Sequence, residues 1–165
     1  MTTRVRPVAR EDTAAWLRMR QALWPEYENG WHAKEIDAFL AGRSNMPLAV
    51  LVAVDGTDRP IGFVELFIRP YAEDCETDRV AYLEGWYVEP ECRRQGVGRG
   101  LIARSEQWGR EQECTEFGSD GSRSWSMSSR VNSGTWSRAS ERAQSQVNAG
   151  GGTSCSHIAF SQQTE

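Results

Sequence analysis

Hydrophobic and polar positions along the first 120 residues follow two periods, and each period predicts one kind of element. Apolar residues three and four positions apart predict helices, whereas alternating or continuous short apolar runs predict strands. The helices are expected at about 12–23, 33–41 and 98–112. The strands are expected at about 4–8, 48–54, 61–68, 80–88 and 114–117. The turn DGTDRP at 55–60 indicates an antiparallel hairpin between the second and third strands.

The pattern changes abruptly after Asp120. Residues 121–165 contain twelve serines, only five residues from Ile, Leu, Val, Phe and Met, and neither period. Such a composition cannot bury enough apolar area to offset the entropy of ordering the chain. We therefore expect one folded domain in residues 1–120 and a Ser/Gly-rich, disordered segment in residues 121–165.

Charge and cysteine content narrow the class of protein. Residues 1–120 hold 21 Asp and Glu against 15 Lys and Arg, which disfavours nucleic acid as a partner and suits a cationic small ligand. An acidic surface that only keeps the protein soluble would have the same balance. The four cysteines form no C-x-x-C pair, so we expect neither a metal site nor a disulfide framework. The longest aliphatic run, 48–54, is too short to cross a membrane, and we expect a cytoplasmic protein.

The sequence RRQGVG at 93–98 stands between an apolar strand and a helix. Gly96 and Gly98 open that helix, where free backbone N–H groups and the helix dipole attract an anion. Glycine allows the backbone to approach a ligand closely, and Arg93, Arg94 and Arg99 add positive charge at the rim. The loop therefore predicts a phosphate cradle, although a flexible surface turn with solvated arginines explains the same residues.

The loop and the order of elements together resemble the GNAT acetyltransferases. Their pattern Arg/Gln-x-x-Gly-x-Gly/Ala is met by Arg93, Gly96 and Gly98. The stretches ALWP, LEGWYV and SD, with Tyr71 and Cys75 before the third long strand, resemble the aminoglycoside 6'-N-acetyltransferases of that family over about residues 1–120. The resemblance implies an α/β (α+β) GNAT fold with a mixed, mostly antiparallel sheet flanked by helices.

The resemblance also implies a reaction and its binding residues. Acetyl-CoA would be the co-substrate, and its acetyl group would pass to the 6'-amine of an aminoglycoside antibiotic, which confers resistance. The residues expected to bind acetyl-CoA through its pyrophosphate and pantetheine are Trp86, Tyr87, Val88, Arg93, Arg94, Gln95, Gly96, Val97, Gly98 and Arg99.

Three residues are the catalytic candidates that this resemblance gives. Glu84 would accept a proton from the substrate ammonium, directly or through water, and strand alternation places it on one face with Tyr82 and Trp86. Asp120 would contact an amine, and Tyr71 would contact the sugar or act as an acid. The substrate-binding candidates are Trp24, Tyr71, Glu84 and Asp120, with Trp31 as a second aromatic surface. Ordinary alternatives are a paired strand carboxylate for Glu84, core packing for Trp24 and surface packing for Tyr71.

The family pattern stops after SD. Its members continue with a His-x-x-Leu-Gly-Phe element and further strands, which have no counterpart in residues 121–165. We therefore expect the C-terminal strands of the sheet to be missing or disordered, and a change of reading frame near codon 120 would explain the difference. Two other functions stay open, a GNAT enzyme for a peptide or polyamine and a catalytically impaired CoA-binding domain. A homodimer also stays open.

Overall fold

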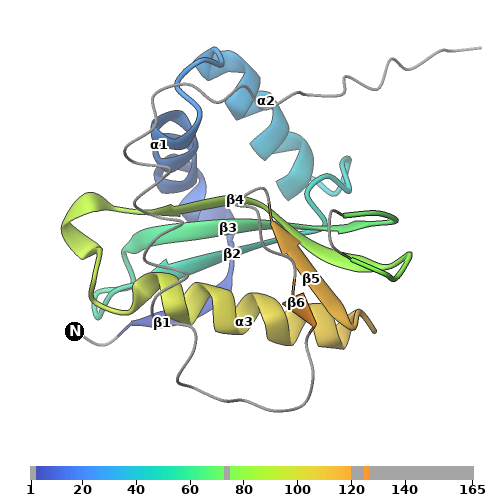
Figure 1. The fold of residues 1–165 in the computed structure, drawn as a ribbon. Coiled ribbons are helices and arrows are strands. Elements are labelled where there is room, and N and C mark those ends of the chain that lie inside the picture. The colour runs from blue at the N-terminus through green and yellow to red at the C-terminus, as the bar shows by residue number, and fades with distance from the viewer. Residues whose placement is uncertain (1–2, 73–74, 120–124, 127–165) are drawn as a thin grey trace, which may run out of the picture. The chain divides into compact units, whose positions relative to one another are not determined.

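A computed structural model of the chain describes residues 3–72, 75–119 and 125–126. Within these residues, strands join into one sheet in the order β1-β2-β3-β4-β5-β6 (Figure 1). The strands are β1 (Arg4–Pro7), β2 (Ala49–Val54), β3 (Pro60–Arg69), β4 (Val80–Val88), β5 (Glu116–Ser119) and β6 (Trp125–Ser126). Neighbouring strands are antiparallel except β4 and β5, which are parallel. The expected mixed, mostly antiparallel sheet is confirmed.

Helices cover both faces of this sheet. They are α1 (Thr13–Leu23), α2 (Asn29–Leu40) and α3 (Val97–Glu111), with short 3₁₀ turns η1 (Arg10–Asp12) and η2 (Pro90–Cys92). Figure 1 shows α1 and α2 on one face and α3 on the other. Because helices cover both faces, β2 and the first part of β3 are buried almost continuously rather than at alternate positions. The connection from β4 to β5 runs through α3, as a parallel pair requires.

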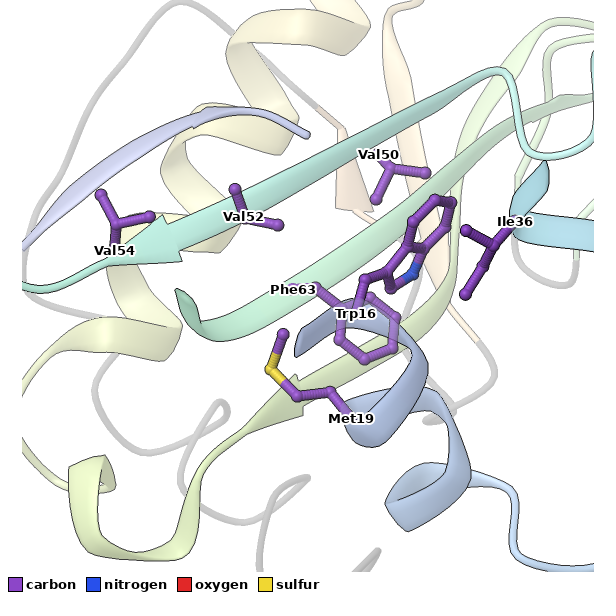
Figure 2. Packing of buried hydrophobic residues seen from close by; sticks show 7 residues of the cluster. All are labelled: Trp16, Met19, Ile36, Val50, Val52, Val54 and Phe63. Carbon is purple, nitrogen blue, oxygen red and sulfur yellow. The ribbon is translucent and has the colours of Figure 1, made fainter. Parts of the chain in front are cut away.

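The larger core lies between the sheet and the first two helices. Seven buried residues form it, and Figure 2 shows them converging from α1, α2, β2 and β3. They are Trp16, Met19, Ile36, Val50, Val52, Val54 and Phe63. On the opposite face, a Cβ built on Gly62 would lie 3.3 Å from Leu101 of α3, so β3 and α3 are closely packed there. The larger core on one face and the contact with α3 on the other therefore hold β3 between two layers of side chains.

Element boundaries differ from the sequence-based expectation in three places. The turn after α1 covers residues 24–28. The second helix begins directly after it, at Asn29, four residues before the expected start. Asp12 stands at the N-cap of α1 but does not cap it. Instead its carboxylate accepts a hydrogen bond from the Ala9 N–H at 2.8 Å and from Arg6 at 2.7 Å. Trp125–Ser126, inside the segment expected to lack structure, form β6 against β5.

Candidate active site

An irregularity in the pairing of β3 and β4 lies at Glu84. Glu65 of β3 lies opposite Gly85, and the next residue, Leu66, lies opposite Leu83. Glu84 is therefore left without a partner in the register, which is the signature of a β-bulge. Bulges bend a strand and redirect its side chains, and they are common beside functional sites.

This bulge shows that one sequence-based expectation is wrong. Tyr82, Glu84 and Trp86 were expected on one face, but Tyr82 pairs with Phe67 and Trp86 pairs with Val64. Phe67 and Val64 are three residues apart on a regular part of β3, so they point to opposite faces of the sheet. Tyr82 and Trp86 therefore also lie on opposite faces, because the extra residue breaks the period of two.

The Glu84 carboxylate is held by Arg69, the last residue of β3. Nη2 of Arg69 donates a charge-assisted hydrogen bond to Oε2 of Glu84. The same guanidinium lies 3.7 Å from the ring centroid of Tyr82, in cation–π contact. The side chains of Arg69 and Glu84 are 37% and 28% exposed, so solvent and small ligands can reach this ion pair.

Gly85, next to the bulge, provides space for an aromatic ring. A Cβ built at Gly85 would lie only 2.6 Å from Cη2 of Trp24, a distance that packed atoms do not reach. The Trp24 indole therefore lies directly on the backbone of β4, one residue from Glu84. Trp24 and Glu84, both expected to bind substrate, therefore lie close together in the fold.

A buried carboxyl, Glu65, lies opposite Gly85 on β3. It is 2% exposed, accepts a hydrogen bond from the indole Nε1–H of Trp16 at 2.9 Å and lies 3.0 Å from Nε of Arg20. Removal from water raises the pKa of Glu65 to about 7, even though Arg20 and the Trp16 hydrogen bond act in the opposite direction. The negative charges of Glu35 and Glu84 add to this rise. Glu65 is thus a titratable group near neutral pH directly beneath the site.

Arg20 connects this carboxyl to a group of aromatic rings. Its guanidinium lies 5.3 Å from the Trp24 ring, 5.5 Å from the Trp31 ring and 5.9 Å from the Trp16 ring. Nη2 of Arg20 also donates to Glu35 at 2.8 Å.

Around Trp24 and Trp31, further ring contacts involve Tyr27 and His32. We call Trp24, Tyr27, Trp31 and His32 the aromatic cluster. Trp31 is the exposed member, and Trp24 is partly buried.

The edge of β4 opposite β3 opens at the bulge. β5 pairs with β4 only from Val80 to Leu83. Beyond Leu83, none of the strands in the described part of the chain pairs with this edge, although β3 continues along the other edge to Val88. Backbone groups of residues 84–88 can therefore serve a ligand that lies between β4 and β5. This is the edge at which the pantetheine of acetyl-CoA was expected.

The glycine loop follows directly after this edge. Gly96 is the N-cap of α3 and has a left-handed backbone with φ of 84°. Apart from the chain neighbours of Gly96, no atom of the described residues lies within 4 Å of a Cβ built there, so these residues leave the space beside the N-terminus of α3 open. The first N–H groups of a helix have no partners within the helix, which makes this position suitable for a phosphate. The residues present thus fit the pyrophosphate of CoA.

The arginines of the loop have different surroundings. Arg93 is tied back to β4, because its Nε donates to the Val88 carbonyl at 2.9 Å and its guanidinium lies 5.8 Å from the Tyr87 ring. Arg94 and Arg99 are exposed. Among the remaining residues expected to bind acetyl-CoA, Gln95 donates to the Glu91 carbonyl, Val88 and Val97 are buried, and Trp86 and Gly98 are partly buried. Of the three arginines in the loop, Arg94 and Arg99 are therefore the ones exposed to a phosphate at its rim.

One expected site residue, Tyr71, is not brought into this group by the structure, and another, Asp120, cannot be assigned to it. Tyr71 lies after the end of β3 and is 73% exposed. Asp120 lies outside the described residues, one position beyond the end of β5. The roles expected for both residues stay predictions.

Arg20, Glu65 and Arg69 were missed in the sequence. A signal existed for two of them. Glu65 is the only charge within the apolar run IGFVELFI, and Arg20 follows Trp16 by four residues, on the buried side of α1. A charge at a position that the period assigns to the core needs a buried partner. Nothing comparable marks Arg69, because it stands at the end of a strand.

Two further observations concern the described residues only. No group of three His, Cys, Asp or Glu side chains there is arranged to hold a metal ion. No helix in the ranges given above has both the length and the apolar character needed to cross a membrane.

Comparisons with known proteins agree with this geometry. The acetyltransferase (GNAT) family model matches residues 16–124. Aminoglycoside N(6')-acetyltransferase type 1 of Klebsiella aerogenes is 53% identical over 116 residues, which are 70% of this chain and 76% of the relative. The protein of the same name from Stenotrophomonas maltophilia is 35% identical over 117 residues, covering 70% of this chain and 73% of its own.

Solved structures give the same result. Aminoglycoside N-acetyltransferase AAC(6')-Iy in complex with CoA has a TM-score of 0.65 and 30% identity over 72% of this chain and 76% of that one. AAC(6')-Iy in complex with the bisubstrate analogue CoA-S-monomethyl-acetylneamine has a TM-score of 0.67 and 25% identity over 99% of both chains. The chain is an acetyltransferase and belongs to the GNAT family.

Proposed function

We propose that this enzyme transfers the acetyl group of acetyl-CoA to the 6'-amine of aminoglycoside antibiotics, in the cytoplasm, where acetyl-CoA is available. The relatives named above bear that activity in their names, and the bisubstrate analogue bound to AAC(6')-Iy joins CoA to an aminoglycoside fragment. One observation in this chain carries the proposal. Glu84 stands at the bulge on β4, where the open strand edge that leads to the Gly96 loop begins.

In this arrangement, the loop and the strand edge hold the co-substrate. N–H groups at the start of α3 bind its pyrophosphate, and Arg94 and Arg99 add charge at the rim. Backbone groups of residues 86–88 pair with the amides of the pantetheine arm. The thioester then lies near residue 84, where β4 and β5 separate.

Glu84 and the aromatic cluster receive the amine. An alkyl ammonium has no lone pair, so one proton must leave before nitrogen can attack the thioester carbon. Glu84 attracts the cation and accepts this proton, directly or through one water. The new C–N bond forms as the C–S bond breaks, and the nitrogen releases its second proton to water. The departing thiolate takes up a proton, for which Tyr71 is the candidate donor. Trp24 and Trp31 contact the apolar faces of the sugar rings, and Asp120 binds a further amine.

Release of free CoA thiol tests this function. Purified full-length protein would be given acetyl-CoA with tobramycin, and a parallel sample would contain an aminoglycoside with a hydroxyl at the 6' position. We expect thiol release only with the 6'-amine. The Glu84→Gln variant, which keeps the side-chain shape, should lose about 10²–10⁴-fold in kcat/KM. Glu111→Gln, at the end of α3 and 47% exposed, is the matched control and should be unaffected.

The outcomes separate the candidate functions. Release that requires the 6'-amine and Glu84 supports the proposal. Release with polyamines or peptides but not with tobramycin would show a GNAT enzyme with another substrate. Binding of acetyl-CoA without release across a panel of amines would show a CoA-binding domain that has lost turnover.

A further inference from the structure

Arg69 occupies the position at Glu84 that a substrate cation needs. In the structure, its guanidinium already donates to the Glu84 carboxylate, and it stacks 3.7 Å over the Tyr82 ring. A substrate ammonium would bring a second positive charge to the same carboxylate. Two cations sharing one carboxylate repel each other, so their binding is competitive.

The two carboxylates that contact Arg20, Glu65 and Glu35, have a buried cationic partner instead. Glu65 is buried and contacts Arg20 and Trp16. Glu35 accepts from Nη2 of the same Arg20, whose side chain is only 5% exposed. Among Glu35, Glu65 and Glu84, it is Glu84 whose cationic partner is partly exposed, because Arg69 is 37% exposed and Arg20 only 5%. A cationic ligand can therefore displace Arg69 from Glu84.

We propose that Arg69 is the resident counter-ion of Glu84 and that a substrate ammonium replaces it, which makes Arg69 a residue that determines specificity. The inference deepens the proposed function, because it rests on Glu84 as the amine-binding carboxylate. Ion pairs as exposed as this one are weak, so the exchange is easy for a cationic ligand. The Tyr82 ring keeps the displaced guanidinium nearby through the cation–π contact. A neutral ligand cannot take the place of the guanidinium, so Arg69 selects against it.

The change in affinity for a cation when Arg69 loses its charge distinguishes a competing Arg69 from one that only orients Glu84. Arg69→Gln removes the charge but keeps a side-chain amide that can donate to the carboxylate. If Arg69 competes with substrate, this variant binds a cation more tightly. If Arg69 only orients Glu84, the variant binds the cation less well. Arg69→Lys retains the competing charge and should bind much as the wild type does.

Titration calorimetry with tobramycin tests the inference. Full-length wild type, Arg69→Gln and Arg69→Lys would be titrated at low salt with CoA present, so that no turnover occurs. We expect the dissociation constant of Arg69→Gln to be about fivefold lower than that of the wild type. Arg110→Gln is the matched control, because Arg110 forms an ion pair on α3 and is 43% exposed. It removes the same charge away from β4 and should leave affinity unchanged.

Equal or weaker binding by Arg69→Gln than by the wild type would overturn the inference and leave the proposed function intact. Tighter binding by Arg110→Gln to the same extent would also overturn it, because the gain would then reflect net charge alone. If no variant binds tobramycin while all bind acetyl-CoA, the proposed substrate and the inference fail together. Tighter binding confined to Arg69→Gln supports the inference.

Discussion

Glu65→Gln replaces a buried carboxyl by an amide of nearly the same shape. The amide oxygen can still accept the Trp16 hydrogen bond, so packing is retained. What the variant loses is the titration of Glu65, whose pKa burial raises from 4.5 to about 7. A difference of this size corresponds to about 3 kcal/mol of unfolding free energy.

The sign of the pH dependence follows from proton binding. Between about pH 4.5 and 7, folded Glu65 keeps its proton while the unfolded chain has released it. Because the folded state binds more protons, the free energy of unfolding falls as pH rises through this window. The stabilisation is fully present below about pH 4.5 and is lost above about pH 7. The Gln variant has no such loss.

Urea denaturation followed by tryptophan fluorescence at several pH values would measure this pH dependence of the free energy of unfolding. The unfolding free energy of Glu65→Gln minus that of the wild type should increase by about 3 kcal/mol between pH 4.5 and 8. Subtracting the two curves removes the contributions of carboxyls that both proteins share, such as Glu116, whose pKa is lowered by hydrogen bonds from Thr77. A difference that stays constant, or that decreases with pH, would refute the reasoning. A decrease would mean that the ion pair with Arg20 outweighs burial.

Three further substitutions test neighbouring parts of the site. Gly85→Ala places a methyl group 2.6 Å from Trp24, so we expect a stability loss of about 1–3 kcal/mol in thermal unfolding and weaker aminoglycoside binding. Gly96→Ala forces a side chain into a left-handed backbone at a cost of about 1–2 kcal/mol and should raise the KM for acetyl-CoA; an unchanged KM would contradict the loop's role. Arg20→Met leaves Glu65 without its cation and should cost about 3–5 kcal/mol in urea denaturation at pH 8, above the pKa of Glu65. Adding Glu65→Gln should recover part of that loss, and no recovery would show that the two residues act independently.

Local patterns in the sequence were sufficient for the order of the three helices and the first five strands, and for the position of the glycine loop. The strand 61–68 and the helix 98–112 agree with β3 and α3 to within one residue at each end. They could be predicted because hydrophobic periodicity and glycine placement act over a few neighbouring residues. The GNAT family was identified from the same local motifs, and the family match over residues 16–124 confirms it.

Tertiary structure decided which residues meet at the site. Tyr82 and Trp86 lie on opposite faces because the bulge depends on the register between β3 and β4, which alternation along one strand does not contain. Arg20 and Glu65 are 45 positions apart in the sequence, and Arg69 meets Glu84 only because the two strands are paired. The sequence alone therefore determined the helices, the first five strands and the family. The partners of each charge depended on long-range pairing, because burial and distance between segments set the strength of a charge interaction.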